Sequence, residues 1–493
     1  MSIFLFFVLC LSFHEWDKGN TVVGARVSCP GDCGKQNDLV EGINAFAVDM
    51  YKHIEKQNKT KNVFFSPVSI STALSILLMG ARGETKSQME DVLGVSSITG
   101  NVDSMYTCLN RNLYGRTKGT ELRSANKLYH DKTLKVKTEF INAITKYYEG
   151  SIEELDFKKS TWATAKINSW VAKQTNQLIK EVLQPGDIDA NTVFALVNAI
   201  YFKGDWLAQF EKSDTTTQPF LSCADCSTFD VAMMYQEAPF KHYHDNVLEA
   251  QFLELPFVGE KYCMVLIVPD DRCGIDMLTN DLTAENLKQS LDTLLQDYSG
   301  RDVYLSLPKL KFKWKDELSK ILEDMGMEDL FSSKVNLGGF SNDSRLDVSK
   351  VIHEAFVDVD EKGTEAAAVT VIAGGRSGYT PPPVKVNCNH PFMFLIYDKT
   401  CGVIVFLGKV MEPGKVEKIN QLSADAIVEC RENCRQLCFD KLVKSGRTIK
   451  SSKQKLGAKK KFKAEFKGMR KCKRESEECK CKPSGGRSGL NVC

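Results

Sequence analysis

Residues 361–377 read Glu361-Lys362-Gly363-Thr364-Glu365-Ala366-Ala367-Ala368-Val369-Thr370-Val371-Ile372-Ala373-Gly374-Gly375-Arg376-Ser377, and they constrain the architecture of this 493-residue chain more than any other segment. Small side chains follow a glycine, and the second half is rich in Gly and Ala and ends in one basic residue. In an extended chain alternate side chains share a face, so one face would carry Thr364, Ala366, Ala368, Thr370 and Ile372. Such a segment could enter a β-sheet without clashing with the layer beneath, yet loop-forming residues flank it. The sequence therefore predicts a strand that is held outside its sheet.

The N-terminus carries a candidate signal peptide. Residues 3–13 form an apolar stretch of signal-peptide length that is too short to span a bilayer, and a small-residue cleavage site follows at Val23-Gly24-Ala25. No other segment approaches the roughly 20 apolar residues of a transmembrane helix. We therefore expect residues 1–25 to be removed and the protein to be secreted and extracellular, with no membrane anchor. The alternative is that the apolar stretch is a buried first helix.

The cysteine content agrees with export. The chain has 17 cysteines, of which Cys10 would leave with the signal peptide, and the remaining even number is compatible with full pairing. The close pairs Cys29/Cys33 and Cys223/Cys226 would suggest half of a zinc site in a cytosolic protein, but no His lies at ligand spacing beside them. Disulfides are therefore favoured over a metal site, although their connectivity cannot be read from the sequence.

Two N-glycosylation acceptors would become usable on a secretory route: Asn58-Lys59-Thr60 and Asn342-Asp343-Ser344. Either tripeptide can occur by chance, so each is weak evidence alone. Together with the cysteines, they lead us to expect a disulfide-bonded glycoprotein.

The charge is divided between two parts of the chain. Residues 414–493 carry 22 Lys and Arg against 9 Asp and Glu, a net charge of +13, which leaves −11 for the rest of a chain whose total is +2. Seven cysteines also lie there, and the apolar periodicity of the body stops near Val410, before the turn-forming Pro413-Gly414. We therefore predict four parts: a signal peptide (1–25), a short Cys-containing segment (26–37), a large domain (38–413) and a basic Cys-rich extension (414–493).

The large domain mixes helices and strands. Helical apolar spacing covers Leu39–His53 and Ala163–Leu183, and Ser66 is the predicted N-cap of a helix that begins at Pro67. An apolar and β-branched run indicates a buried strand at 192–202. Residues 262–268 and 302–308 are also strand-like, and 390–410 predicts two strands joined at 398–402. The pattern is typical of an α+β domain.

Four separated segments match one family pattern in order. They are Asn62–Ile70 with Gly80–Thr85, Leu196–Trp206, Asp360–Ala368, and His390–Ile396 with Gly408–Val410. In these residues, across positions 38–412, the chain resembles the serpins, a family of large metastable protease inhibitors. The resemblance implies a fold of three β-sheets and about eight or nine helices with an exposed reactive-centre loop, and an inhibitor of serine-type endopeptidases rather than an enzyme.

By this resemblance, a target serine protease cuts the loop and is trapped as an acyl-enzyme while the cut loop inserts into the main sheet as a new strand. The hinge that enters first would comprise Glu361, Gly363, Thr364, Glu365, Ala366, Ala367 and Ala368. Bulky, charged or proline residues at the inward positions would raise the barrier to insertion, and this hinge has none there. The sequence therefore favours an inhibitory member. The alternative is a non-inhibitory member that acts as a carrier, storage or polyanion-binding protein.

The resemblance also assigns a polar cluster, the shutter, beneath the centre of the main sheet. It would consist of Ser66, Ser69, Asn198 and His353, with Trp206 at the breach where insertion starts. Buried hydroxyls, an amide and an imidazole can satisfy one another's hydrogen bonds. Each residue also has an ordinary interpretation: Ser66 as a helix cap, His353 as a hydrogen-bonded core histidine, and Trp206 as core packing.

The reactive bond is expected between Arg376 and Ser377. Arg376 is the only basic residue between Glu365 and Lys385, and it suits a trypsin-like protease with an acidic specificity pocket. Counted from Gly363, the commoner register of the family would instead place the bond after Ser377. The bond after Arg376 requires a loop one residue shorter, and both positions remain open.

The extension contains a dense basic cluster, composed of Lys459, Lys460, Lys461, Lys463, Arg470, Lys471, Lys473 and Arg474. Such clusters attract sulfated polysaccharide, nucleic acid or anionic membrane through their summed potential. Outside the cell, a heparin-like glycosaminoglycan is the expected polyanion, although the extension can also be read as merely solvated and partly disordered. We expect a monomer with no cofactor or metal. A serine hydrolase is not supported, because the chain has no Gly-x-Ser-x-Gly elbow.

Overall fold

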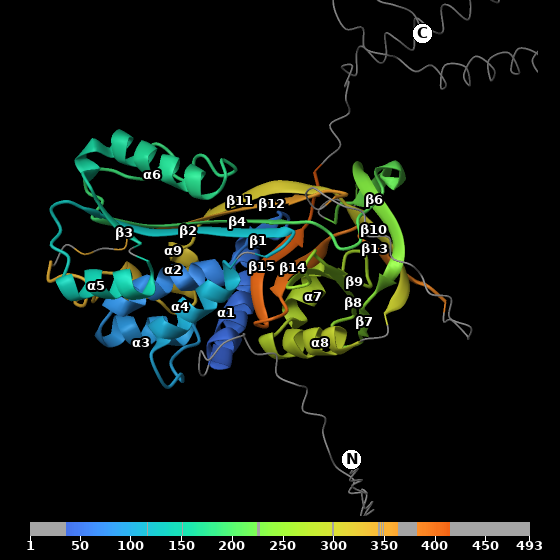
Figure 1. Ribbon diagram of the computed structural model, residues 1–493, viewed down its shortest axis with the longest axis horizontal. Coiled ribbons are helices and arrows are strands. Elements are labelled where there is room, and N and C mark those ends of the chain that lie inside the picture. Colours follow the sequence, from blue (N-terminus) through green and yellow to red (C-terminus); the bar gives the residue numbers. More distant parts are fainter. Residues whose placement is uncertain are drawn as a thin grey trace, which may run out of the picture. The chain divides into compact units, whose positions relative to one another are not determined.

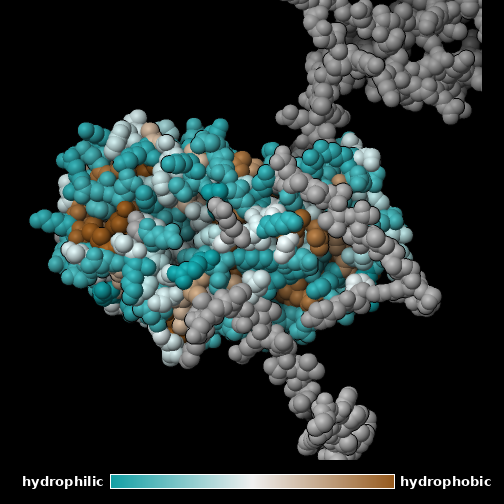
Figure 2. Space-filling view, in the orientation of Figure 1, coloured by the Kyte–Doolittle hydropathy of each residue, from teal (hydrophilic) through white to brown (hydrophobic). Residues whose placement is uncertain are grey.

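The computed structural model in Figure 1 describes residues 36–414, apart from residues 116, 150, 224–226, 298–299, 344–345, 347, 349 and 363–381. The predicted signal peptide, the N-terminal Cys-containing segment up to residue 35, the hinge beyond Lys362, the reactive bond and the basic extension after Gly414 therefore lie outside the described residues. The surface seen in this view is largely hydrophilic, with apolar patches at its left-hand end and right of its centre (Figure 2).

A five-stranded sheet forms the centre of the described domain. Its order is β11 (Leu310–Glu317), β12 (Val351–Val359), β4 (Phe194–Gly204), β2 (Thr120–Asp131) and β3 (Ile152–Leu155). β12 runs antiparallel to β11 but parallel to β4, and β4 runs antiparallel to β2. The parallel junction between β12 and β4 is short: it joins six residue pairs, while β11–β12 joins eight and β2–β4 joins eleven.

Two smaller sheets complete the strands of the described residues. An antiparallel six-stranded sheet has the order β1 (Val63–Phe65), β15 (Val403–Val410), β14 (Phe392–Asp398), β9 (Tyr262–Pro269), β8 (Ala250–Pro256) and β7 (His242–Asp245). A four-stranded sheet has the order β13 (Val384–Asn387), β10 (Arg301–Pro308), β6 (Thr228–Phe240) and β5 (Thr216–Leu221). The undescribed segment 363–381 therefore connects the end of β12 in the central sheet to the start of β13 in another sheet.

Nine α-helices lie within the described residues. They are α1 (Gln36–Gln57), α2 (Pro67–Gly80), α3 (Gly83–Val92), α4 (Val102–Leu113), α5 (Thr138–Tyr147), α6 (Ser160–Gln174), α7 (Ile275–Asp281), α8 (Ala284–Gln296) and α9 (Ser319–Asp324), with short 3-10 turns at Phe157–Lys159, Lys212–Asp214 and Asp329–Phe331. In Figure 1, α6 lies on one side of the central sheet, and α2, α4 and α5 lie on the other. The expected α+β fold with three sheets is confirmed. None of these helices combines the length and apolarity needed to cross a bilayer.

The predicted helix over Ala163–Leu183 is too long. α6 ends at Gln174, and Asn176 and Gln177 then adopt positive φ angles of 49° and 65°, which break the helix. Ile179, Val182 and Leu183 still pack against the core that α6 covers, but from an irregular segment. These buried residues happen to be spaced as on a helix, although the segment is irregular. The apolar periodicity therefore predicted a helix that was too long.

Successive side chains of the central strands point to opposite faces of the sheet, and each face packs in a different core. On β4, Leu196, Ile200 and Phe202 join the large core on the side of α2, whereas Val197 and Tyr201 join the smaller core beneath α6. Asn198 has the same parity as the first set and is also buried. A polar side chain thus lies in the middle of an apolar row, and this is the first structural sign of a functional site.

The cysteines differ from the expectation of full pairing. Cys223 is bonded to Cys273, 50 residues along the chain, and Cys108 and Cys401 are also disulfide-bonded. Cys263 and Cys388 are free thiols that are completely buried. They behave as small apolar side chains of the core, so an even count of cysteines did not imply that all of them pair.

Candidate functional site

Three polar side chains form a row across the centre of the central sheet. In the strand register, His353 of β12 is the direct partner of Asn198 of β4, and Asn198 is the partner of Asn126 of β2. The first turn of α2, which carries Ser66 and Ser69, meets this row from the inner side. The four predicted shutter residues therefore come together, although 287 positions separate Ser66 from His353.

His353 joins the helix to two strands of the sheet. The backbone N–H of Ser66 donates to Nε2 of His353 at 3.2 Å, so that nitrogen carries no proton. The proton is therefore on Nδ1, which donates to Oδ1 of Asn198. Burial lowers the pKa of His353 to about 3, and the imidazole is neutral at physiological pH. Only this tautomer satisfies both hydrogen bonds.

Asn198 and the two serines complete the network. The Asn198 amide donates to the Ser69 carbonyl at 3.0 Å and to the Ser69 hydroxyl at 2.7 Å. Ser66 caps α2 by accepting from the Ser69 N–H, and its hydroxyl donates to the carbonyl of Val405 at 2.6 Å. The helix-cap and shutter interpretations of Ser66 are therefore compatible. Removal of any member would leave buried polar groups unsatisfied, at a cost of about 1–3 kcal/mol for each group.

Two members of the network were missed by sequence reasoning. Asn126 accepts from the Asn198 amide, and Ser124 exchanges a hydrogen bond of 3.0 Å with Ser69. Both lie on β2 with the parity of Leu122 and Leu128, which belong to the large core. That parity could have placed them on the inner face, but polar residues that alternate with charged ones along β2 look like an ordinary solvent-facing pattern.

The central sheet is open at one end of the row. Pairing between β12 and β4 stops at Phe356 and Tyr201, although β12 continues to Val359 and β4 to Gly204. A small cavity lies between the unpaired ends; among the residues that line it are Phe202, Gly204, Trp206, Phe257, Val357 and Val359. A chain that leaves β12 and turns back would run antiparallel to both β12 and β4, so a parallel pair gives an incoming strand two antiparallel neighbours.

Trp206 closes the top of this opening. Its ring stacks on Phe257, with centroids 4.5 Å apart, and its Nε1 donates to the carbonyl of Asp360 at 2.9 Å. Its backbone N–H also donates to the carbonyl of Lys362 at 3.3 Å. Trp206, predicted at the breach, therefore packs in the core and binds Asp360 and Lys362, among the last described residues before segment 363–381.

Glu361 is the second fastening of the same segment. Only 3% of it is exposed, and its Oε1 lies 2.7 Å from Nζ of Lys309 and accepts from the hydroxyl of Thr215 at 2.7 Å. Burial alone would raise the pKa of Glu361, but the hydrogen bonds from Lys309 and Thr215 outweigh it and hold the pKa below its ordinary value. The first predicted hinge residue is thus an ionised clamp, and the remaining hinge residues, from Gly363 to Ala368, lie outside the described part.

The two predicted glycosylation sites differ in access. Asn342 is exposed, whereas Asn58 is half-buried and its side-chain nitrogen donates to the carbonyl of Ile54 at 3.0 Å. The nitrogen that would carry the sugar is therefore already bonded in Asn58. Asn342 is the more accessible of the two acceptors.

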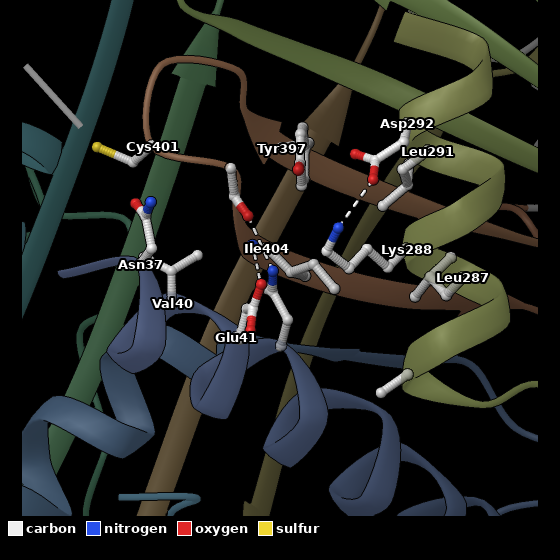
Figure 3. Close-up of a pocket in the computed structure, with 13 residues that line it drawn as sticks. Asn37, Val40, Glu41, Leu287, Lys288, Leu291, Asp292, Tyr397, Cys401 and Ile404 are labelled. Atoms are coloured by element: carbon white, nitrogen blue, oxygen red, sulfur yellow. Dashed lines mark hydrogen bonds and ion pairs between the residues drawn. The ribbon is translucent and has the colours of Figure 1, made fainter. Parts of the chain in front are cut away.

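A second hollow lies between α1, α8 and the β14–β15 turn (Figure 3). Most of its polar groups are engaged within the protein: Lys288 pairs with Asp292 at 2.8 Å, and Asn44 bonds to the carbonyl of Gly402 and the N–H of Ile404. None of the predicted site residues lines it. In the described part of the chain, no group of three His, Cys, Asp or Glu side chains is placed to hold a metal ion.

Comparison with known proteins gives a consistent result. The family model described as "Serpin (serine protease inhibitor)" matches residues 41–413. Serpin B3 of Homo sapiens is 36% identical over 394 residues, which cover 76% of this chain and all of that protein. The leukocyte elastase inhibitor of Xenopus laevis is 36% identical over 386 residues, with the same coverage.

Solved structures agree with these sequence matches. Uncleaved ovalbumin superposes with a TM-score of 0.68 and 26% identity, over 76% of this chain and all of the ovalbumin chain. Maspin superposes with a TM-score of 0.69 and 27% identity, over 77% of this chain and all of the maspin chain.

Acid should destabilise the protein through His353. The pKa of His353 is about 3 in the folded state, below its ordinary value of 6.5. The contribution of the neutral imidazole to the free energy of unfolding is therefore complete above pH 6.5. It is lost as the pH falls toward 3, by on the order of 5 kcal/mol in total. His353→Gln can keep both hydrogen bonds but does not titrate, while the carboxylates titrate alike in both proteins. The difference in free energy of unfolding between the wild type and His353→Gln, measured by urea denaturation, should therefore shrink between about pH 7 and pH 4. A pH-independent advantage would contradict this role.

Glu361→Gln should weaken the closed sheet. The substitution removes the charge that binds Lys309, and it should lower the free energy of unfolding by about 1–3 kcal/mol. The matched control is Glu90→Gln, because Glu90 pairs with Lys86 at 3.3 Å on an exposed helix face and should change stability by less than about 0.5 kcal/mol. Equal effects of the two substitutions would show that Glu361 is no clamp.

Proposed function

The chain belongs to the serpin family, and we propose that it is a secreted inhibitor that traps a trypsin-like serine protease as a covalent acyl complex. Serpins are protease inhibitors and not enzymes, and this chain spans the full length of the relatives that it matches. The open end of the junction between β12 and β4 carries the proposal, because it directly adjoins the segment that continues into the predicted reactive-centre loop.

The proposed mechanism begins with attack on the bond between Arg376 and Ser377. Glu361 and Trp206 hold the start of the loop at the opening while the sheet is closed. After acylation, the freed segment from Gly363 onward enters between β12 and β4, and the row of His353 and Asn198 must part to admit it. Residues 364, 366 and 368 are Thr, Ala and Ala, so they place no bulky or charged group beneath the sheet.

The energy of insertion is sufficient for this role. From Gly363 to Arg376 the extended chain spans about 40 Å. Roughly a dozen residues that gain ladder hydrogen bonds at about 0.5–1.5 kcal/mol each would release on the order of 10 kcal/mol. A protease is stabilised by only about 5–15 kcal/mol, so pulling on its acylated site could disorder that site.

The proposed specificity rests on Arg376. The name of the Xenopus relative refers to leukocyte elastase, and proteases of that class have a small specificity pocket that a guanidinium does not fit. This chain instead offers a single Arg in the interval from residue 366 to residue 384. We therefore place its target among proteases with an acidic pocket.

Secretion and glycosylation are part of the proposal. The Cys223–Cys273 bridge and the bonded Cys108 and Cys401 support secretion, because disulfides form and persist in oxidising compartments. The apolar stretch at residues 3–13 and the exposed acceptor Asn342 agree with that route.

Incubation with trypsin should give a covalent complex that survives SDS electrophoresis. Arg376→Ala should slow complex formation with trypsin on the order of 10²-fold or more, because it removes the charged contact in the pocket. Arg376→Lys is the matched control and should keep the complex.

Several outcomes of that experiment would change the proposal. Full trapping of trypsin by Arg376→Ala would place the bond elsewhere, and trapping of leukocyte elastase by the wild type would overturn the specificity. Cleavage of the wild type without a complex would favour the non-inhibitory alternative of a carrier or storage protein.

The basic extension is proposed to bind a heparin-like polysaccharide. Replacing its clustered basic residues by Gln in the full chain should lower the salt concentration that elutes the protein from heparin; the eight positions are Lys459, Lys460, Lys461, Lys463, Arg470, Lys471, Lys473 and Arg474. A plain sulfonate cation exchanger serves as the control for charge alone. Unchanged elution from heparin would leave the extension without this role.

A further inference from the structure

An acid-free basic segment lies within an otherwise acidic domain. Between Phe157 and Lys180 the sequence has five lysines and no Asp or Glu, although the chain outside the extension carries a net charge of −11. α6 occupies most of this segment and has no acidic residue in its first turn. No acidic side chain within this segment therefore balances its positive charge.

The lysines form a straight row on the outward face of α6. Lys159 directly precedes the helix, and Lys166 and Lys173 follow at intervals of seven residues, a rise of about 10.5 Å per interval. All three are exposed, as is Lys158. The opposite face carries Ala163, Ile167 and Val171, which are completely buried against the central sheet. The row is thus fixed in place by a packed helix.

Trp162 lies in the same row and is about half exposed, at 51%. Nζ of Lys166, one turn further along α6, is 5.1 Å from the centroid of its ring. Among the other described tryptophans, Trp206 and Trp314 are 2% and 7% exposed, and Trp170 is half-buried. A flat aromatic face is therefore presented to solvent between the first two lysines of the row.

Helix stability alone does not account for this arrangement. Lysines at a helix N-terminus oppose the macrodipole, and Lys158 and Lys159 stand at the start of α6. Trp162 leaves about half of its surface in water, so it gives up much of the stabilisation that full burial of an indole would bring. In Figure 2 this part of the surface, where Figure 1 places α6, is mainly hydrophilic, so the indole is not part of a broad apolar interface.

We propose that the outward face of α6 binds a sulfated polysaccharide through Lys158, Lys159, Lys166 and Lys173, with a sugar ring on Trp162. A stiff linear polymer with a charge on each repeat can follow evenly spaced cations on a rigid helix, and the apolar face of a sugar can cover an indole. A lipid surface would need a wider apolar face, and that face of α6 is buried in the protein. This site is separate from the one proposed for the extension and does not depend on protease inhibition.

Lys166 shows how the site would respond to its ligand. Its Nζ lies 2.6 Å from Oε1 of Glu153 on β3, and the other carboxylate oxygen lies 2.8 Å from Lys127 on β2. A sulfate group at Lys166 would replace Glu153, which retains Lys127 as its partner. Glu153 is therefore a competitor for the ligand, and its removal should strengthen binding.

The test is a titration of the full chain with short heparin fragments, monitored by tryptophan fluorescence. The ligand should change the emission of the wild type, and most of that change should be absent in Trp162→Phe. The triple variant Lys159→Gln, Lys166→Gln and Lys173→Gln should bind about 10-fold more weakly at this site, and its slope of log affinity against log salt should fall by about three. Glu153→Gln should bind about two- to threefold more tightly, because the ligand no longer has to break the ion pair between Glu153 and Lys166. Ion pairs near the surface contribute little free energy, so the gain in affinity is small.

A matched control removes the same charge from other helices. Lys86→Gln, Lys288→Gln and Lys320→Gln together eliminate three exposed, ion-paired lysines of α3, α8 and α9, and the Trp162 signal should keep its affinity within twofold. An equal loss of affinity in both triple variants would show that only the net charge matters, and it would overturn the proposed site. Fluorescence that does not change while heparin binds would assign all binding to the extension. Tighter binding of single-stranded DNA of equal charge would overturn the assignment to polysaccharide.

Discussion

The short parallel junction between β12 and β4 is the constraint on which the rest of the structure depends. Six residue pairs hold it, and the middle of its inner side, between the core residues Leu196 and Ile200, is fastened by hydrogen bonds of His353, Asn198 and the first turn of α2. Polar contacts of this kind have a discrete geometry, since they are made or broken within a small displacement. In the proposed mechanism, these contacts would hold the sheet closed and would have to break together when it opens.

The opposite edge of β12 is fastened much more firmly. Eight residue pairs join it to β11, and Lys309 and Lys311 reach across to Glu361 and Asp358 at 2.7 and 2.8 Å. If the sheet separates, β11 and β12 should therefore move together, and the gap should form on the β4 side. In the proposed mechanism, this asymmetry would locate the opening on the β4 side, in addition to any effect of the entering loop.

Much of the fold could be predicted from the sequence, because four well-separated segments fit one family pattern, the strand at 262–268 carries a continuous apolar run, and the strand at 302–308 alternates apolar with polar residues. The shutter residues were identified only through the family resemblance, since no local pattern links Ser66 to His353. Ser124 and Asn126 were missed because their neighbours on β2 include charged residues. The excess length assigned to α6 has a different origin: residues in an irregular segment can be buried at helical intervals. The partner of Cys223 lies 50 residues away and depends on tertiary structure alone.

If the chain is secreted, as proposed, its two free thiols constrain the order of folding. Cys263 lies in β9 and Cys388 directly follows β13, and both are completely buried in a protein whose other described cysteines are bonded. In an oxidising compartment an exposed thiol can be captured by any nearby cysteine, and burial is what removes it from exchange. In such a compartment, Cys263 and Cys388 would escape exchange if the strands around them assembled before oxidation was complete. The timing of collapse would then protect the correct disulfides, in addition to the geometry of the finished fold.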